Sequence, residues 1–256
     1  MKSLESKLRQ VRAEGAKALV PYFMAGVTPD WTDHVMAAAH AGATAIEIGL
    51  PFSDPMMDGV IIQEAALRSL NSGTTIEKVC GELADLDIDV PLVAMTYFNV
   101  FHHFGLERSL GSLREAGISG AIVPDLSYEE SGEWRELSNQ FDVANIFLVA
   151  PSTSTERAAL LARETEGFCY ASARMTVTGK DTLGGFSISV VENIRQASDV
   201  PVFVGIGIST PEQAASAAKA SDGAIVGSAL VQTILDGASP QQTEQFIASF
   251  RKVIDA

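Results

Sequence analysis

The sequence predicts a single (β/α)8 TIM barrel with an extra N-terminal helix, and three observations support that fold class. Short apolar runs that end in Gly or Pro alternate along the chain with helix-capping signals and Ala/Leu-rich amphipathic stretches. Alternating strands and helices imply parallel strands joined by right-handed crossovers. Eight such units suit a barrel of about 250 residues, and the chain has 256, with no linker or composition step. We therefore expect one domain over residues 1–256, with an open doubly wound sheet as the alternative.

The elements follow in order. Leu4, Leu8 and Val11 recur at helical spacing with basic residues between them, which predicts a short N-terminal capping helix. The predicted strands are 18–25, 44–49, 91–96, 120–124, 145–150, 168–172, 201–205 and 223–227.

Capping-box spacing predicts four helix starts between these strands. The pairs are Thr74/Glu77, Ser127/Glu130, Thr153/Glu156 and Thr210/Gln213. Pro29 and Pro211 are each expected at a first helical position, where proline loses no hydrogen bond.

Charge and composition exclude several classes of partner. The net charge of −14 repels nucleic acid and anionic lipid, so neither is expected to bind. No apolar run is long enough to cross a bilayer, and residues 1–20 lack the apolar core of a secretion signal. Cys80 and Cys169 show no metal-ligand spacing and are expected to be free thiols in a reducing compartment. These features predict a soluble, cytoplasmic protein.

Glu47 is the first candidate for chemistry. If Ile46 and Ile48 pack against the helices, alternation points Glu47 into the barrel near the carboxyl end of its strand. A desolvated carboxylate there would have a raised pKa suited to proton transfer. The alternative is a structural Glu paired with an internal Lys or Arg, but the strand segments offer almost no basic residues.

Two aspartates follow on the loop after the same strand. Asp58 precedes Gly59, and two interpretations are open: it is a turn residue, or it is the second member of a carboxylate pair with Glu47. Asp54, which precedes Pro55, reads equally as a helix cap or as a functional group.

Glycines at the ends of the last two predicted strands suggest a phosphate site. Gly205-Ile206-Gly207 ends one strand, and Gly227-Ser228 ends the other. Backbone amides at glycines can approach a phosphate closely, and phosphate sites recur at this place in barrels. Ordinary tight turns are the alternative.

Two other features of the sequence allow more than one interpretation. Residues 174–185 are either a lid that excludes water or an ordinary loop, and Tyr170 is either a core aromatic or a pocket wall. No metal-ligand spacing, Schiff-base lysine or nucleophile elbow is evident. The residues alone thus indicate metal-independent acid/base chemistry on a phosphorylated small molecule.

Over essentially its whole length the chain resembles the alpha subunit of tryptophan synthase. The most specific motif is the segment 46–55 followed by Asp58-Gly59. Supporting motifs are Met95-Thr96-Tyr97-Phe98-Asn99, Pro124-Asp125-Leu126, Glu129-Glu130-Ser131, Thr176-Val177-Thr178-Gly179 and the two glycine clusters.

The resemblance implies retro-aldol cleavage of indole-3-glycerol phosphate to indole and glyceraldehyde 3-phosphate. Glu47 matches the acid/base that protonates the indole ring, and Asp58 matches the carboxylate that accepts the indole N–H. The matched indole-pocket positions are Tyr22, Met95, Ile122 and Tyr170. The matched phosphate positions are Gly179, Gly207, Gly227 and Ser228, and the matched lid residue is Thr178.

The same resemblance implies a beta-subunit partner in an alpha2-beta2 heterotetramer, with Asp54, Pro55 and Asn99 towards the interface. Pyridoxal phosphate is expected only in that partner, and no cofactor or metal in this chain.

The sequence also departs from the family pattern. Thr176 stands where the lid usually has glycine, and Val100 stands where proline is usual. Two alternatives therefore stay open: a stand-alone lyase that releases free indole, and a non-catalytic subunit that binds a phosphoester and regulates its partner.

Overall fold

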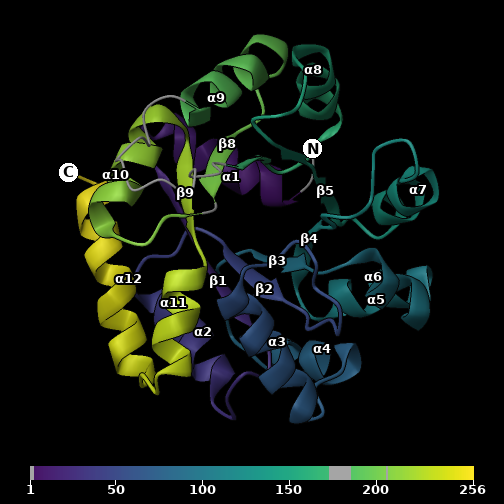
Figure 1. The fold of residues 1–256 in the computed structure, drawn as a ribbon, viewed down its shortest axis with the longest axis vertical. Coiled ribbons are helices and arrows are strands. Elements are labelled where there is room, and N and C mark those ends of the chain that lie inside the picture. Colours follow the sequence, from purple (N-terminus) through teal and green to yellow (C-terminus); the bar gives the residue numbers. More distant parts are fainter. Residues whose placement is uncertain (1–2, 173–185, 206) are drawn as a thin grey trace.

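The computed structural model describes residues 3–172, 186–205 and 207–256 and shows a barrel of parallel strands surrounded by helices (Figure 1). Neighbouring strands are hydrogen-bonded in the order β5-β4-β3-β2-β1-β9-β8-β7-β6. The strands are β1 (Ala18–Met24), β2 (Ile46–Gly49), β3 (Leu92–Met95), β4 (Ile118–Ile122), β5 (Ala144–Ile146), β6 (Leu148–Val149), β7 (Cys169–Ser172), β8 (Val202–Gly205) and β9 (Gly223–Val226). The predicted fold class is confirmed.

The barrel closes through β5 and β6, which are two pieces of one predicted strand separated by Phe147. The Phe147 N–H donates to Thr165 Oγ1, while its carbonyl accepts from the backbone N–H of Tyr170 on β7. On one side of this residue β5 pairs with β4, and on the other side β6 pairs with β7. Phe147 is therefore the point at which the strand changes partner.

Helices follow the strands and cover the outside of the barrel (Figure 1). In the described part of the chain they are α1 (Ser3–Ala13), α2 (Trp31–His40), α3 (Val60–Asn71), α4 (Ile76–Ala84), α5 (Phe98–Phe104), α6 (Leu106–Glu115), α7 (Gly132–Gln140), α8 (Thr155–Glu164), α9 (Phe186–Ala197), α10 (Pro211–Ala220), α11 (Ser228–Leu235) and α12 (Pro240–Ile254).

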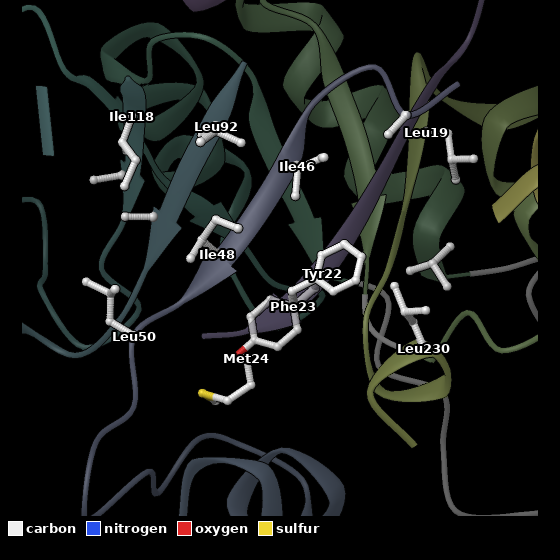
Figure 2. Close-up of a cluster of buried hydrophobic side chains, with 14 of the residues drawn as sticks. Leu19, Tyr22, Phe23, Met24, Ile46, Ile48, Leu50, Leu92, Ile118 and Leu230 are labelled. Carbon is white, nitrogen blue, oxygen red and sulfur yellow. The ribbon is translucent and has the colours of Figure 1, made fainter. Parts of the chain in front are cut away.

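Strand alternation divides the core into an outer and an inner layer. The outer layer lies between strands and helices and includes Ile46 and Ile48 of β2, beside Leu92 and Ile118 on the next strands (Figure 2). A second cluster fills the barrel itself; its strand members include Val20, Val93, Ile122, Phe203 and Ile225, and Ala45 joins it just before β2. Because side chains alternate along a strand, the residue between Ile46 and Ile48 points inward.

Helix α1 closes the amino-terminal end of the barrel. Leu4 and Leu8 are fully or almost fully buried and belong to the inner cluster. A Cβ added at Gly120 of β4 or at Gly167 before β7 would come within 2.8 Å of the Leu4 side chain. The predicted N-terminal helix is thus confirmed. Because it covers the end at which the strands begin, the open end of the barrel is the one at which the strands finish.

One of the four predicted capping boxes forms as expected. Thr210 and Gln213 cap α10 reciprocally, with Pro211 at its first turn. A second box, Ser239 with Gln242, begins α12 and was not predicted.

The other predicted helix starts were wrong by one residue or more. Helix α4 is capped by Thr75 rather than Thr74, and α8 by Ser154 rather than Thr153. In both cases two hydroxyl residues are adjacent and the first has another role: Thr74 is buried, and Thr153 Oγ1 accepts from the Ala150 N–H.

Two further starts also differ from the prediction. Ser127 hydrogen-bonds Glu130 within a turn, and α7 begins only after Ser131. Pro29 precedes α2, which begins at Trp31 after Asp30.

Candidate active site

A cavity of about 230 Å³ lies at the carboxyl ends of the strands, where a barrel of this type carries its chemistry. It brings together most of the residues that the sequence singled out. Its lining residues are Tyr22, Glu47, Met57, Asp58, Gly59, Ile62, Met95, Pro124, Leu148, Tyr170, Gly207, Ile208, Ile225, Gly227 and Ser228.

Glu47 points into this cavity from the middle of β2, in register with Tyr22 of β1. Only 1% of its surface is exposed, and its Oε2 atom has no hydrogen-bond partner among the residues that the structure describes. Burial, and after it the negative charge of Asp58, raise the pKa of Glu47 to about 8. A carboxylic acid with this pKa keeps its proton at neutral pH and can donate it.

Asp58 lies on the loop between β2 and α3 and is held by a tyrosine. The Tyr97 hydroxyl donates to Asp58 Oδ2 at 3.2 Å and accepts from the Met57 backbone N–H at 2.8 Å. Burial raises the pKa of Asp58, and the hydrogen bond from Tyr97 opposes that increase.

The two carboxyl groups differ in burial and in partners. Burial is the main cause of the raised pKa of Glu47, whereas the increase in the pKa of Asp58 is opposed by the hydrogen bond from Tyr97. This environment favours Glu47 as the group that keeps its proton and Asp58 as the group that ionises first, which is the division of roles that acid/base chemistry uses.

Tyr22 and Tyr170 line the cavity together with Glu47, and two glycines make room for their side chains. A Cβ added at Gly49 would overlap the hydroxyl of Tyr22, and one added at Gly205 would overlap the hydroxyl of Tyr170. Burial raises the pKa of both tyrosines well above the usual value. Both hydroxyls therefore stay neutral. Tyr170 lines the cavity and also belongs to the inner cluster, so it is a pocket wall as well as a core aromatic.

The opposite part of the cavity presents backbone donors. Gly227 is the N-cap residue of α11 and offers no side chain to cap it, in contrast to the side-chain cap at the start of α10. Gly227, Ser228 and Gly207 all line the cavity. Uncapped N–H groups at a helix start, together with the helix dipole, favour an anion.

Comparison with known proteins decides the family. The family model described as "Tryptophan synthase alpha chain" matches residues 8–255. The chain belongs to this family. The resemblance noted in the sequence is thus confirmed, and with it the assignment as a lyase of tryptophan biosynthesis.

Curated relatives and solved structures agree with this assignment. The tryptophan synthase alpha chain of Bifidobacterium longum is 44% identical, over 88% of this chain and 78% of that protein. The one from Geobacillus kaustophilus is 40% identical, over 90% of each. The structure of Mycobacterium tuberculosis tryptophan synthase in space group F222 matches with a TM-score of 0.91 and 32% identity, covering 100% of this chain and 99% of that one. Tryptophan synthase subunit alpha from Legionella pneumophila matches with a TM-score of 0.89 and 30% identity, covering 100% of this chain and 99% of that one.

Four of the remaining family-matched positions lie outside the cavity lining. Ile122 is fully buried in the inner cluster, in register with Met95. Asp54 is exposed and Pro55 half-buried on the loop after β2, and Asn99 is exposed in the first turn of α5. Thr178 and Gly179 lie outside the described residues.

Tyr97 is the main site residue that sequence reasoning missed. It was noted only as part of a motif, without a role. Its position just past the carboxyl end of β3, where a polar group faces the active end of a barrel, was the available signal. The apolar wall residues Met57, Ile62 and Leu148 carry no comparable signal.

In the described part of the chain, no three His, Cys, Asp or Glu side chains come together in a way that could hold a metal ion. Nor is any helix of that part long and apolar enough to span a membrane. Cys80 and Cys169 are buried free thiols, and burial raises the pKa of each to about 12.

Proposed function

We propose that Glu47 and Asp58 carry the cleavage of indole-3-glycerol phosphate to indole and glyceraldehyde 3-phosphate. The observation that supports this most is the pairing of a buried Glu47, whose Oε2 atom has no partner, with a hydrogen-bonded Asp58 in one largely apolar cavity of the described chain. Such a site accommodates a flat ring and supplies one proton donor and one negative charge.

In the first step neutral Glu47 gives its proton to the ring carbon that bears the glyceryl chain. The ring nitrogen becomes positively charged, and its N–H donates a hydrogen bond to the Asp58 carboxylate. This interaction strengthens as the charge develops, so it lowers the barrier rather than only binding the substrate.

In the second step the Glu47 carboxylate removes the proton of the hydroxyl next to the ring. The O–H electron pair becomes the carbonyl of the aldehyde, the carbon–carbon bond breaks, and its electron pair returns to the ring. Indole and glyceraldehyde 3-phosphate leave, and Glu47 is protonated again.

The rest of the cavity orients the substrate. Tyr22, Met95 and Tyr170 contact the ring, with Ile122 as a further predicted contact behind Met95. The phosphate binds at Gly207 and at the start of α11, whose backbone N–H groups and dipole favour it.

Indole passes from this chain to a beta subunit in an alpha2-beta2 assembly. The predicted contact residues Asp54 and Pro55 share their loop with Met56, which is 81% exposed, and α3 begins just beyond it at Val60, which is 79% exposed. The third predicted contact residue, Asn99, is exposed in the first turn of α5. An apolar surface of this kind is typical of a protein interface. Pyridoxal phosphate belongs to the partner, this chain uses no cofactor, and the two free thiols fit the reducing cytoplasm.

The test is indole release from indole-3-glycerol phosphate by the purified chain, with and without a beta subunit. The proposal predicts slow release that the partner accelerates. Fast release by the chain alone would instead support the stand-alone lyase that Val100 and Thr176 left open. No release in either condition would leave the non-catalytic, phosphoester-binding subunit.

A further inference from the structure

Tyr97 links the partner-facing loop to the reacting carboxylate. It lies just after β3, is 4% exposed, and precedes α5. Its ring stacks on Phe52 of the loop after β2, with centroids 5.1 Å apart and planes inclined by 29°. One tyrosine thereby joins the ends of two neighbouring strands.

The direction of the hydroxyl proton is determined by its two partners. A backbone N–H can only donate, so the bond from the Met57 N–H makes the Tyr97 oxygen an acceptor. The single phenolic proton is then available for Asp58 Oδ2, 3.2 Å away. Oδ1 of Asp58 has no protein donor among the described residues, which leaves it for a ligand N–H.

The backbone around Tyr97 is also fixed. The next residue, Phe98, donates its N–H to Asp125 Oδ1 at 2.8 Å, and the preceding Thr96 donates its hydroxyl to the Leu50 carbonyl at 2.9 Å. A donor held on both sides loses little entropy when it binds its acceptor.

We propose that Tyr97 is the positioning residue for Asp58: it fixes one carboxylate oxygen so that the other meets the indole N–H. This inference rests on the proposed function and extends it to a residue to which the family resemblance gave no role. Tyr97 acts through Asp58 and does not itself exchange a proton with the substrate.

The inference predicts a specific change in the variant Tyr97→Phe, which keeps the ring and its stacking on Phe52 but removes the hydroxyl. The kcat for indole release should fall by roughly tenfold or more, as expected for a lost hydrogen bond to a charged group. KM should change little, because the misplaced charge matters most in the transition state.

The pH profile of kcat distinguishes a role of Tyr97 in positioning Asp58 from a role in packing alone. The Tyr97 hydrogen bond lowers the pKa of Asp58 against burial, so its loss raises that pKa. Because Asp58 must be ionised, the acidic limb of the profile should move to higher pH. Among the described residues, the other titratable groups that line the cavity are Glu47 on β2, Tyr22 on β1 and Tyr170 on β7. The substitution at Tyr97 replaces none of these three side chains.

Tyr128→Phe is the matched control, because Tyr128 loses the same atom from a ring that packs on Phe147 outside the cavity. Carbon-13 NMR of labelled aspartate should show a higher titration midpoint for Asp58 in Tyr97→Phe and an unchanged one in the control. An unmoved midpoint, or wild-type kcat in Tyr97→Phe, would overturn the inference. A raised midpoint in a chain whose wild type releases no indole would overturn the proposed function instead.

Discussion

Glu47 should destabilise the folded protein at neutral pH, and Glu47→Gln should reveal by how much. An unfolded chain releases this proton near pH 4.5, while the folded chain keeps it up to about pH 8. Between these values the folded state binds one more proton, so stability falls as the pH rises. Glutamine has nearly the same shape and never ionises, so the variant lacks this part of the pH dependence.

The size of the effect follows from the shift. Each pH unit within the window weakens the wild type, relative to Glu47→Gln, by about 1.4 kcal/mol. From pH 5.5 to pH 7.5 the gap between the two proteins should therefore change by about 2 to 3 kcal/mol in favour of the variant. Asp58 is present in both proteins, so its own titration largely cancels.

The assay is urea unfolding followed by circular dichroism at several pH values and constant ionic strength. Glu244→Gln, on the exposed side of α12, is the matched control and should run parallel to the wild type. Parallel curves for Glu47→Gln and the wild type across this window would refute the buried, proton-holding Glu47 described above.

Three further results are expected. In kcat/KM for the wild type, the alkaline limb should have its midpoint near pH 8, because Glu47 must be protonated to start the reaction; a rate that stays constant up to pH 10 would contradict this. Gly205→Ala should lower kcat/KM by about tenfold or more with the far-UV spectrum unchanged, because the new methyl group displaces the Tyr170 hydroxyl. Leu4→Ala should lower the free energy of unfolding by about 2 to 5 kcal/mol in urea titrations, whereas Leu67→Ala at a 60% exposed position should change it little.

The sequence predicted the barrel well because its strands are buried on both faces and its helices are amphipathic. The strands therefore appear as short continuous apolar runs, and the helices as apolar residues at helical spacing. It also predicted the direction of Glu47, since one alternation rule and the two flanking isoleucines determine it. Helix starts were less predictable: where Thr74 and Thr75 both offer a capping hydroxyl, burial of the first decides between them, and burial depends on the tertiary structure.

The candidate site was predictable in part for the same reason. Asp58 and the glycines of the last two strands come from loops that the fold must bring to one end. The hydrogen bond from Tyr97 to Asp58 joins residues 39 positions apart, and no local pattern encodes it. The division of labour between the two carboxyl groups likewise depends on three-dimensional burial and not on spacing.

The most direct test of the central claim is indole release by Glu47→Gln compared with Glu244→Gln, each assayed with a beta subunit present. The account predicts that Glu47→Gln loses about 100-fold or more of the rate, the usual contribution of a general acid/base, while Glu244→Gln keeps it. Full activity in Glu47→Gln would contradict the account, because no other side chain is assigned to the proton transfer.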